Sequence, residues 1–187
     1  MLWTTGGFTV NVVDLVLAAV LILGLLVGMA QGLIRQMLIM LASYMALIVA
    51  AQYYPHIGRS LGPWIGGDSA SRGIIALVST FGVMAAILNW LTYYVYRQTS
   101  LPSLAWGDRV AGAGLGLIWG WALAGLGLVI VNFATSLPWQ AWEPDRVAFT
   151  TLLSRSTLAP FVTGLLPHLF STMRPWLPLG LPAPFVL

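Results

Sequence analysis

The chain contains no cysteine, no lysine and few charged residues of either sign. Its 187 residues include 8 basic and 5 acidic side chains, so charged residues make up only 7% of the sequence. The absence of cysteine excludes disulfides, thiolate nucleophiles and cysteine-ligated metals, and the absence of lysine excludes a phosphate-binding loop of the Gly-Lys type. A charged fraction this small cannot cover the surface of a water-soluble domain.

The basic residues are spread along the chain rather than gathered in a run. The net charge of +3 therefore suits contact with anionic lipid better than contact with nucleic acid, which requires clustered Lys and Arg. We expect the partners to be membrane lipid and either other membrane-protein subunits or further copies of the chain, and we expect no nucleic acid.

Long uncharged stretches dominate the first three quarters of the sequence. A hydrocarbon core about 30 Å thick needs roughly 20 mainly apolar residues per spanning helix. Four stretches meet that length: Asp14 to Arg35, Arg35 to Arg59, Arg72 to Arg97, and Arg109 to Glu143. The sequence therefore predicts an all-α integral membrane protein built as a four-helix bundle.

The chain divides into a membrane part and a tail. We expect a transmembrane domain over residues 1–136, with spans at about 10–29, 33–54, 73–96 and 109–134. Residues 137–187 have short amphipathic patterns interrupted by proline, which cannot continue a helix. We expect them to lie at the membrane interface or to pack under the bundle as an amphipathic, Pro-broken helical tail, with an extended arm from Pro175 onward.

Small residues recur at intervals of about one helical turn in two of the predicted spans. Such rows allow close approach of helix backbones in lipid, where no hydrophobic effect drives helices together. We expect the first span to pack against the fourth, or one of them against a second copy. The proposed packing residues are Gly24, Gly28 and Gly32 in the first row, and Gly112, Gly116, Gly120, Ala124 and Gly127 in the second.

Charged and polar side chains near the span ends are the remaining candidates for a site. Asp14 should face protein, with Arg72 or Arg59 as partner, and Asp108 could meet Arg35 or Arg97; Arg109 and the intramembrane amide Asn89 complete the set. Ion pairs that anchor helix ends are the simplest interpretation, and a proton- or ion-coupled site is the alternative.

Enzymatic signals are absent from the sequence. His56 and His168 are isolated from Asp, Glu and Cys in the sequence, so neither has the ligand neighbours of a metal site. Glu143 and Asp145 are the nearest thing to paired carboxylates, and they are typical of the first turn of a helix. We expect no catalytic activity, no bound metal and no cofactor.

Four segments together resemble one family. They are Gly28 to Gln36, the Gly107-Asp108-Arg109-Val110 stretch before the second glycine row, Tyr53-Tyr54, and Ser156 to Pro160. In this order they resemble the CvpA (colicin V production protein) family over nearly the whole chain. This chain has Gln31 and Gln36 where the family usually has Arg and Glu, and Trp119 where a basic residue is common.

The resemblance implies a non-enzymatic, multi-pass protein of the bacterial inner (cytoplasmic) membrane, with a scaffold, assembly or export-related role exerted through helix–helix contacts. Two alternatives stay open: an accessory subunit of a large membrane complex, photosynthetic or respiratory, and a small transporter or channel component.

Overall fold

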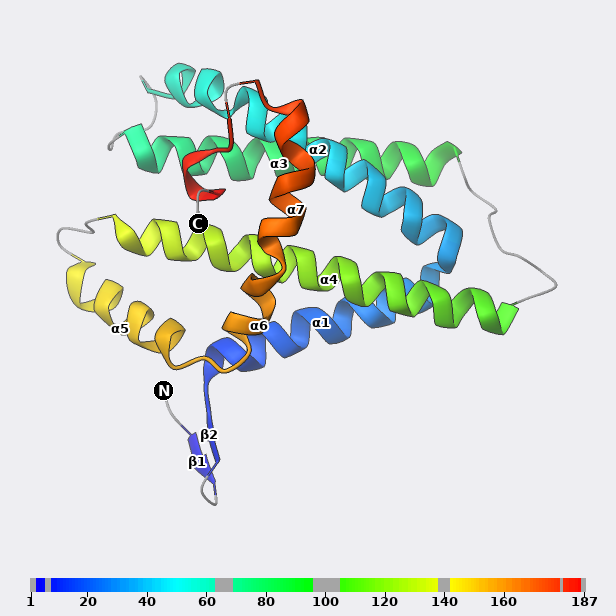
Figure 1. Ribbon diagram of the computed structural model, residues 1–187, viewed down its shortest axis with the longest axis horizontal. Coiled ribbons are helices and arrows are strands. Elements are labelled where there is room, and N and C mark those ends of the chain that lie inside the picture. Colours follow the sequence, from blue (N-terminus) through cyan, green and yellow to red (C-terminus); the bar gives the residue numbers. More distant parts are fainter. Residues whose placement is uncertain are drawn as a thin grey trace.

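Four long helices form the body of the protein. The computed structural model describes residues 3–5, 8–62, 69–95, 105–137, 142–178 and 180–185. Within them, four helices are long and apolar enough to cross a membrane, which confirms the predicted all-α membrane architecture (Figure 1). They are α1 (Val12–Gln31), α2 (Leu33–Ser60), α3 (Ser69–Val95) and α4 (Ala105–Ser136).

The helices are longer than the sequence predicts at several ends. The expected end of the second span at residue 54 is wrong, because α2 continues through Pro55 to Ser60. Proline removes one backbone donor and crowds the preceding turn, which kinks a helix where it does not break it. Figure 1 shows α2 changing direction toward its C-terminal end. The last turns stay helical while packing on α3, where Gly58 is buried near Ala76.

A short hairpin precedes α1. Strand β1 (Trp3–Thr5) pairs antiparallel with β2 (Phe8–Val10), an element that the sequence did not predict. Asn11 then caps α1, since its side-chain oxygen accepts a hydrogen bond from the Val13 N–H at 3.0 Å. An N-cap of this kind satisfies one of the backbone donors that a helix start leaves free.

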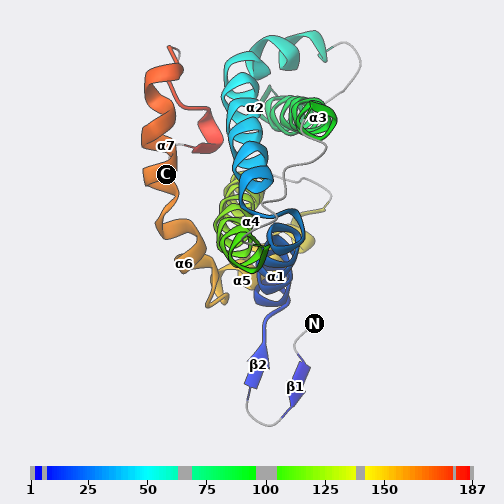
Figure 2. The same cartoon turned by 90° about the vertical axis from the view of Figure 1, so that its right-hand side faces the viewer.

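The four helices form two pairs that are joined chiefly through α2 and α4. α1 packs along α4 and α2 packs along α3, while α2 also touches α4 and so joins the pairs. Seen end-on, the helices follow the order α3, α2, α4, α1, an open row rather than a closed ring (Figure 2). Such a row leaves one broad face of α2 and α4 to be covered by another element.

The tail covers that face. It consists of α5 (Glu143–Ser154), α6 (Ala159–Gly164), α7 (Leu166–Met173) and the 3₁₀ turns η3 (Arg174–Trp176) and η4 (Ala183–Phe185). α6 and α7 run across the long helices rather than along them (Figure 1).

Two hydrogen bonds fix α7 and η3 to α2. The Tyr44 hydroxyl donates to the Thr172 Oγ1 at 3.1 Å, and the Gln52 Nε2 donates to the Trp176 carbonyl at 2.6 Å. Leu166 packs directly on Gly125 of α4. Since Tyr44, Gln52 and Gly125 all lie well inside their helices, the tail meets the middle of the row and not its end.

The main core of the protein is therefore shared between the row and the tail. One cluster of buried side chains joins α2, α3 and α4 to the tail, and the stacked rings of Phe170 and Phe185 lie 4.8 Å apart within it. This finding revises the expected division at residue 137 and the expected extended arm after Pro175, because both segments contribute to the core. The cluster contains Leu47, Ile48, Ala50, Ala51, Leu77, Leu126, Val129, Leu166, Phe170, Met173, Leu177 and Phe185.

The shared core generates a stability prediction. Leu166→Ala should lower the free energy of unfolding by about 2–5 kcal/mol, because it leaves a cavity above Gly125 that the surroundings can fill only in part. Phe161→Ala, on the same segment but 79% exposed, is the matched control and should change stability little. Thermal unfolding of the detergent-solubilised protein measures both. Equal effects of the two substitutions would mean that the tail does not share the core.

Candidate functional site

The α1–α4 contact brings the two glycine rows together. A Cβ added at Gly28 would lie 2.7 Å from the Cα of Gly116, and one added at Gly116 would lie 2.8 Å from the Cα of Gly28. A Cβ at Gly24 would meet the Gly116 carbonyl oxygen at 2.5 Å. Real Cβ atoms do not approach backbone this closely, so the two helices touch backbone to backbone, as small residues permit in lipid.

The seam continues at both ends. A Cβ at Gly112 would lie 2.9 Å from the Cα of Gly32, and one at Gly120 would lie 3.1 Å from the Val20 carbonyl oxygen. Ala124 is buried beside Leu17 in a second apolar cluster. Gly127 lies outside the seam, because a Cβ there would meet nothing within 4 Å.

A second small residue in α4 has a role that the sequence analysis missed. Gly125 faces the tail, and a Cβ there would lie 2.8 Å from a methyl group of Leu166. The spacing-of-four pattern could not reveal it, because Gly125 faces the tail while the seam glycines face α1. α4 therefore uses glycines on two faces for two different contacts.

The turn between α1 and α2 is a single glycine held by an acid from α4. Gly32 has φ +78°, a conformation that side chains with a Cβ rarely adopt. The Leu33 N–H donates to Asp108 Oδ1 at 3.0 Å, so the carboxylate sits at the N-terminal end of α2, where the helix dipole favours negative charge. The expected pairing of Asp108 with Arg35 is therefore wrong, and Arg97 lies outside the described residues.

Arg35 and Arg109 lie at the same end of the spans as Asp108 and have different surroundings. The Arg35 guanidinium lies over the Tyr93 ring, 4.5 Å from its centroid, and links α2 to α3 through a cation–π contact. Arg109 is exposed at the start of α4. Asn89 of α3 donates from Nδ2 to the Ser43 Oγ of α2 at 3.3 Å, which joins the two helices inside the spans.

Asp14 accepts four hydrogen bonds from the tail. Its Oδ1 accepts from the Ser156 hydroxyl at 2.5 Å and from the Leu158 N–H at 3.0 Å. Its Oδ2 accepts from the Thr157 N–H at 3.2 Å and from the Thr157 hydroxyl at 3.1 Å. Two hydroxyls and two backbone amides thus replace the expected arginine partner, and charge-assisted bonds of this kind are the stronger ones.

The arrangement around Asp14 joins the first span to the tail, and we call it the Asp14 junction (Asp14, Ser156, Thr157 and Leu158). The Ser156 hydroxyl oxygen also accepts from the Ala159 N–H, the first backbone donor of α6, at 3.0 Å. A neighbouring bond from the Asn11 Nδ2 to the Leu152 carbonyl, at 2.6 Å, ties the start of α1 to α5.

The two arginines expected near Asp14 lie elsewhere. Arg59 donates from Nε to the Pro55 carbonyl at 3.2 Å and approaches His56 Nδ1 at 3.1 Å. Arg72 lies beside Gly62, where a Cβ would be 2.5 Å from the Arg72 Nη1. Both therefore belong to the α2–α3 end of the row, away from α1.

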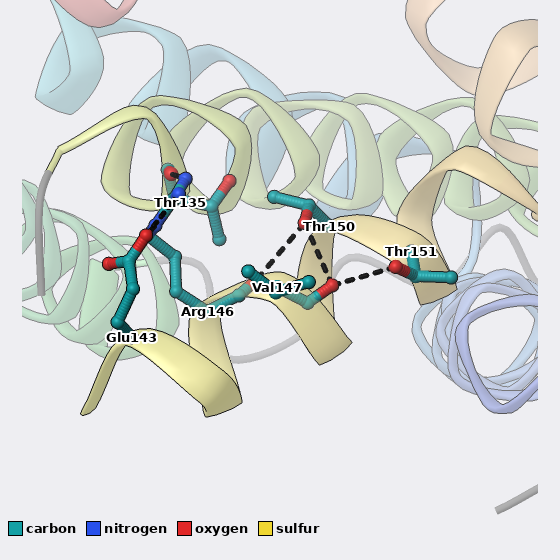
Figure 3. Close-up of polar contacts among 6 residues, drawn as sticks. All are labelled: Thr135, Glu143, Arg146, Val147, Thr150 and Thr151. Carbon is teal, nitrogen blue, oxygen red and sulfur yellow. Dashed lines mark hydrogen bonds and ion pairs between the residues drawn. The ribbon is translucent and has the colours of Figure 1, made fainter.

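A further polar contact joins the C-terminal end of α4 to α5 (Figure 3). Arg146 of α5 forms an ion pair with Glu143 and donates from Nη1 to the Thr135 carbonyl at 2.9 Å. The hydrogen bond to Glu143 raises the pKa of the Arg146 guanidinium. A cation on a carbonyl in the last turn of a helix also complements the helix dipole. The hydroxyls of Thr150 and Thr151 donate to the Val147 carbonyl within α5.

An open groove lies between α4, α5 and α6. It encloses about 430 Å³ and its polar lining includes Asn132, Thr150, Ser154, Ser156 and Thr163. The hydroxyls in this lining donate to backbone carbonyls or to Asp14. Over the described ranges no group of three or more His, Cys, Asp or Glu side chains could hold a metal ion.

These features define a class of protein: a multi-pass helical membrane protein whose polar side chains near the span ends serve to join its helices and tail. Comparison with known families names the group. The family model described as colicin V production protein matches residues 13–167, and the chain belongs to that family.

The matched region includes both glycine rows, Asp108 and the Asp14 junction. The chain is similar to the colicin V production protein homolog of Haemophilus influenzae (strain ATCC 51907 / DSM 11121 / KW20 / Rd), with 25% identity over 134 residues, covering 70% of this chain and 78% of that protein. No solved structure matches the chain.

The glycine seam generates a second prediction. Gly116→Ala should lower the free energy of unfolding by about 1–3 kcal/mol, because the new methyl group forces the α1 backbone away. Gly114→Ala, two residues away in the same helix, is the control, since a Cβ there meets nothing within 4 Å. Unfolding of both variants in the same detergent measures the difference. Equal stability of the two would contradict the close backbone contact.

The Asp14 junction generates a third prediction. Asp14→Asn should destabilise the docked tail by about 1–3 kcal/mol, because the amide presents an N–H₂ group to donors that need an acceptor. Limited proteolysis near Arg155 should become faster in this variant. Asp145→Asn, an exposed acid of α5, should leave the cleavage rate unchanged. Unaltered cleavage in Asp14→Asn would show that the junction does not hold the tail.

Proposed function

We propose that the chain is a non-enzymatic scaffold or assembly protein of the bacterial inner membrane, with an export-related role exerted through helix–helix contacts. The observation that carries the proposal is that the candidate polar residues make contacts within the protein. Asp14, Asp108, Arg35 and Asn89 all contact other helices or the tail. Groups engaged in internal contacts of this kind hold the helices and tail in place.

The rigidity of the α1–α4 pair supports a scaffold role. Two helices in backbone contact cannot slide or rotate without clashes, since interfaces of this kind are not continuously deformable. The outer side of α1 meanwhile offers apolar side chains to lipid or to other membrane proteins. Exposed examples are Leu15, Val16, Ile22, Leu23 and Leu26.

Membership of the family supports the proposal as well. The Haemophilus relative is named for colicin V production, and the resemblance to its family implies an export-related role. For this chain, the export-related part rests on that relationship, and the scaffold part rests on the geometry.

The Asp14 junction bears on the transporter alternative. Ion-coupled sites place a carboxylate where it can lose its partners, near broken spanning helices. Here the carboxylate of Asp14 is surrounded by four hydrogen-bond donors from Ser156, Thr157 and Leu158. That arrangement favours a fixed, structural carboxylate.

The proposal is tested by extracting the tagged chain from its own membranes in mild detergent. We expect it to migrate in an assembly with other membrane proteins, and Gly116→Ala should reduce that assembly while Gly114→Ala leaves it intact. Reconstituted liposomes provide the opposing test. Solute or ion flux through the purified chain, abolished by Asp14→Asn, would overturn the scaffold role in favour of transport. Co-migration with one photosynthetic or respiratory complex would identify an accessory subunit instead.

A further inference from the structure

The last part of the chain folds back on α7 and forms a groove with it. Figure 1 shows the segment after η3 turning back beside α7, and the stacked rings of Phe170 and Phe185, 4.8 Å apart, join the two. The reversal occurs at Gly180, which has φ +82° and donates its N–H to the Leu177 carbonyl at 3.0 Å. The space left between the two segments is about 610 Å³.

The lining of this groove is apolar apart from one charged side chain. Phe170, Leu177 and Phe185 are buried and form its floor, while Leu181 is only half-buried. Arg174 is the one ionisable side chain among the described residues of the lining, and we call the hollow the Arg174 groove. A cavity of this size, with apolar walls and one placed polar group, is typical of a site for a small amphiphilic molecule.

The groove lies close to the basic end of α2. Next to Arg174, the Trp176 carbonyl accepts a hydrogen bond from the Gln52 Nε2 at 2.6 Å. Gln52 precedes Arg59 by seven residues, which is about 10 Å along a helix. The Trp176 ring is 59% exposed, and indole rings favour the headgroup level of a bilayer. A long arginine side chain at this position can extend toward the headgroups while its stem stays among apolar groups.

The charge of Arg174 restricts which molecule fits. Within the described part of the chain no acid forms an ion pair with its guanidinium, and an unpaired guanidinium in apolar surroundings is costly. Arginine binds the two oxygens of a phosphate through parallel hydrogen bonds. A glycerophospholipid carries a phosphate next to its acyl chains, and an anionic one has no amine of its own to compete for that phosphate.

We propose that the Arg174 groove binds one molecule of an anionic glycerophospholipid, with the phosphate on the Arg174 guanidinium and an acyl chain along the floor of Phe170, Leu177 and Phe185. The occupant is a lipid of the surrounding bilayer. The inference stands apart from the scaffold role, because it concerns the neighbour of the tail and not the proteins that the chain assembles with.

Native mass spectrometry of the full chain in mild detergent, supplied with equal amounts of phosphatidylglycerol and phosphatidylcholine, tests the proposal. We expect one phosphatidylglycerol to be retained per chain. Arg174→Gln should lower the affinity for it about tenfold, because a charge-assisted pair is lost, and Arg174→Lys should recover part of that loss. Arg155→Gln is the matched control, since Arg155 is also an exposed arginine of the tail but lies between α5 and α6; it should bind like the unsubstituted chain.

The acyl part of the site has its own test. Leu181→Asn should weaken retention of phosphatidylglycerol while leaving Arg174 in place, because it puts an amide in the apolar lining. Inorganic phosphate in excess should not displace the lipid, since it has no acyl chain to bury. Phosphatidylglycerol should also raise the midpoint of thermal unfolding of the unsubstituted chain, and this rise should be smaller in Arg174→Gln.

Four results would overturn the proposal. Equal retention of the two lipids would mean that the groove does not select an anionic headgroup. Unchanged binding in Arg174→Gln would mean that the lipid sits elsewhere. Displacement by inorganic phosphate would reduce the site to an anion contact, and displacement by decanoate as efficiently as by phosphatidylglycerol would assign the groove to a fatty acid.

Discussion

Backbone contact between α1 and α4 is the constraint on which the rest of the fold depends. Lipid offers no hydrophobic driving force between helices, so close packing has to supply the attraction. Gly24, Gly28 and Gly116 bring the two backbones so near that a single added methyl group would clash. The contact also sets the position of Asp108, which then reaches the Leu33 N–H and holds the one-residue turn into α2.

The tail covers the side of the helix row that the four long helices leave open. A row of four helices leaves one side of α2 and α4 uncovered, and the buried residues of α7 and η4 fill that side. The Asp14 junction fixes the near end of this cover, while the bonds from Tyr44 and Gln52 fix its far end. The protein is thus a single body in which membrane helices and tail share one core.

Charge-free length was enough to predict the four spans, because the thickness of the bilayer sets that length directly. Spacing of small residues predicted a close contact for the first and fourth helices, with each other or with a second copy, but it also included Gly127, where an added Cβ would meet nothing within 4 Å. The partners of Asp14 could not be predicted, since backbone amides and hydroxyls carry no charge by which a sequence search would find them. The position of α7 was equally hidden, because it depends on contacts between residues more than a hundred positions apart.

The order in which the helices are synthesised determines when the α1–α4 contact can form. α1 leaves the ribosome first, yet its glycine face is matched by α4, and Asp14 finds its donors 142 to 144 residues later. Until then α1 lies in the bilayer with its glycine face uncovered and the Asp14 carboxylate without these donors. Contacts between residues far apart in a chain form slowly, so the α1–α4 contact and the Asp14 junction can form only after α4 and the tail have been synthesised.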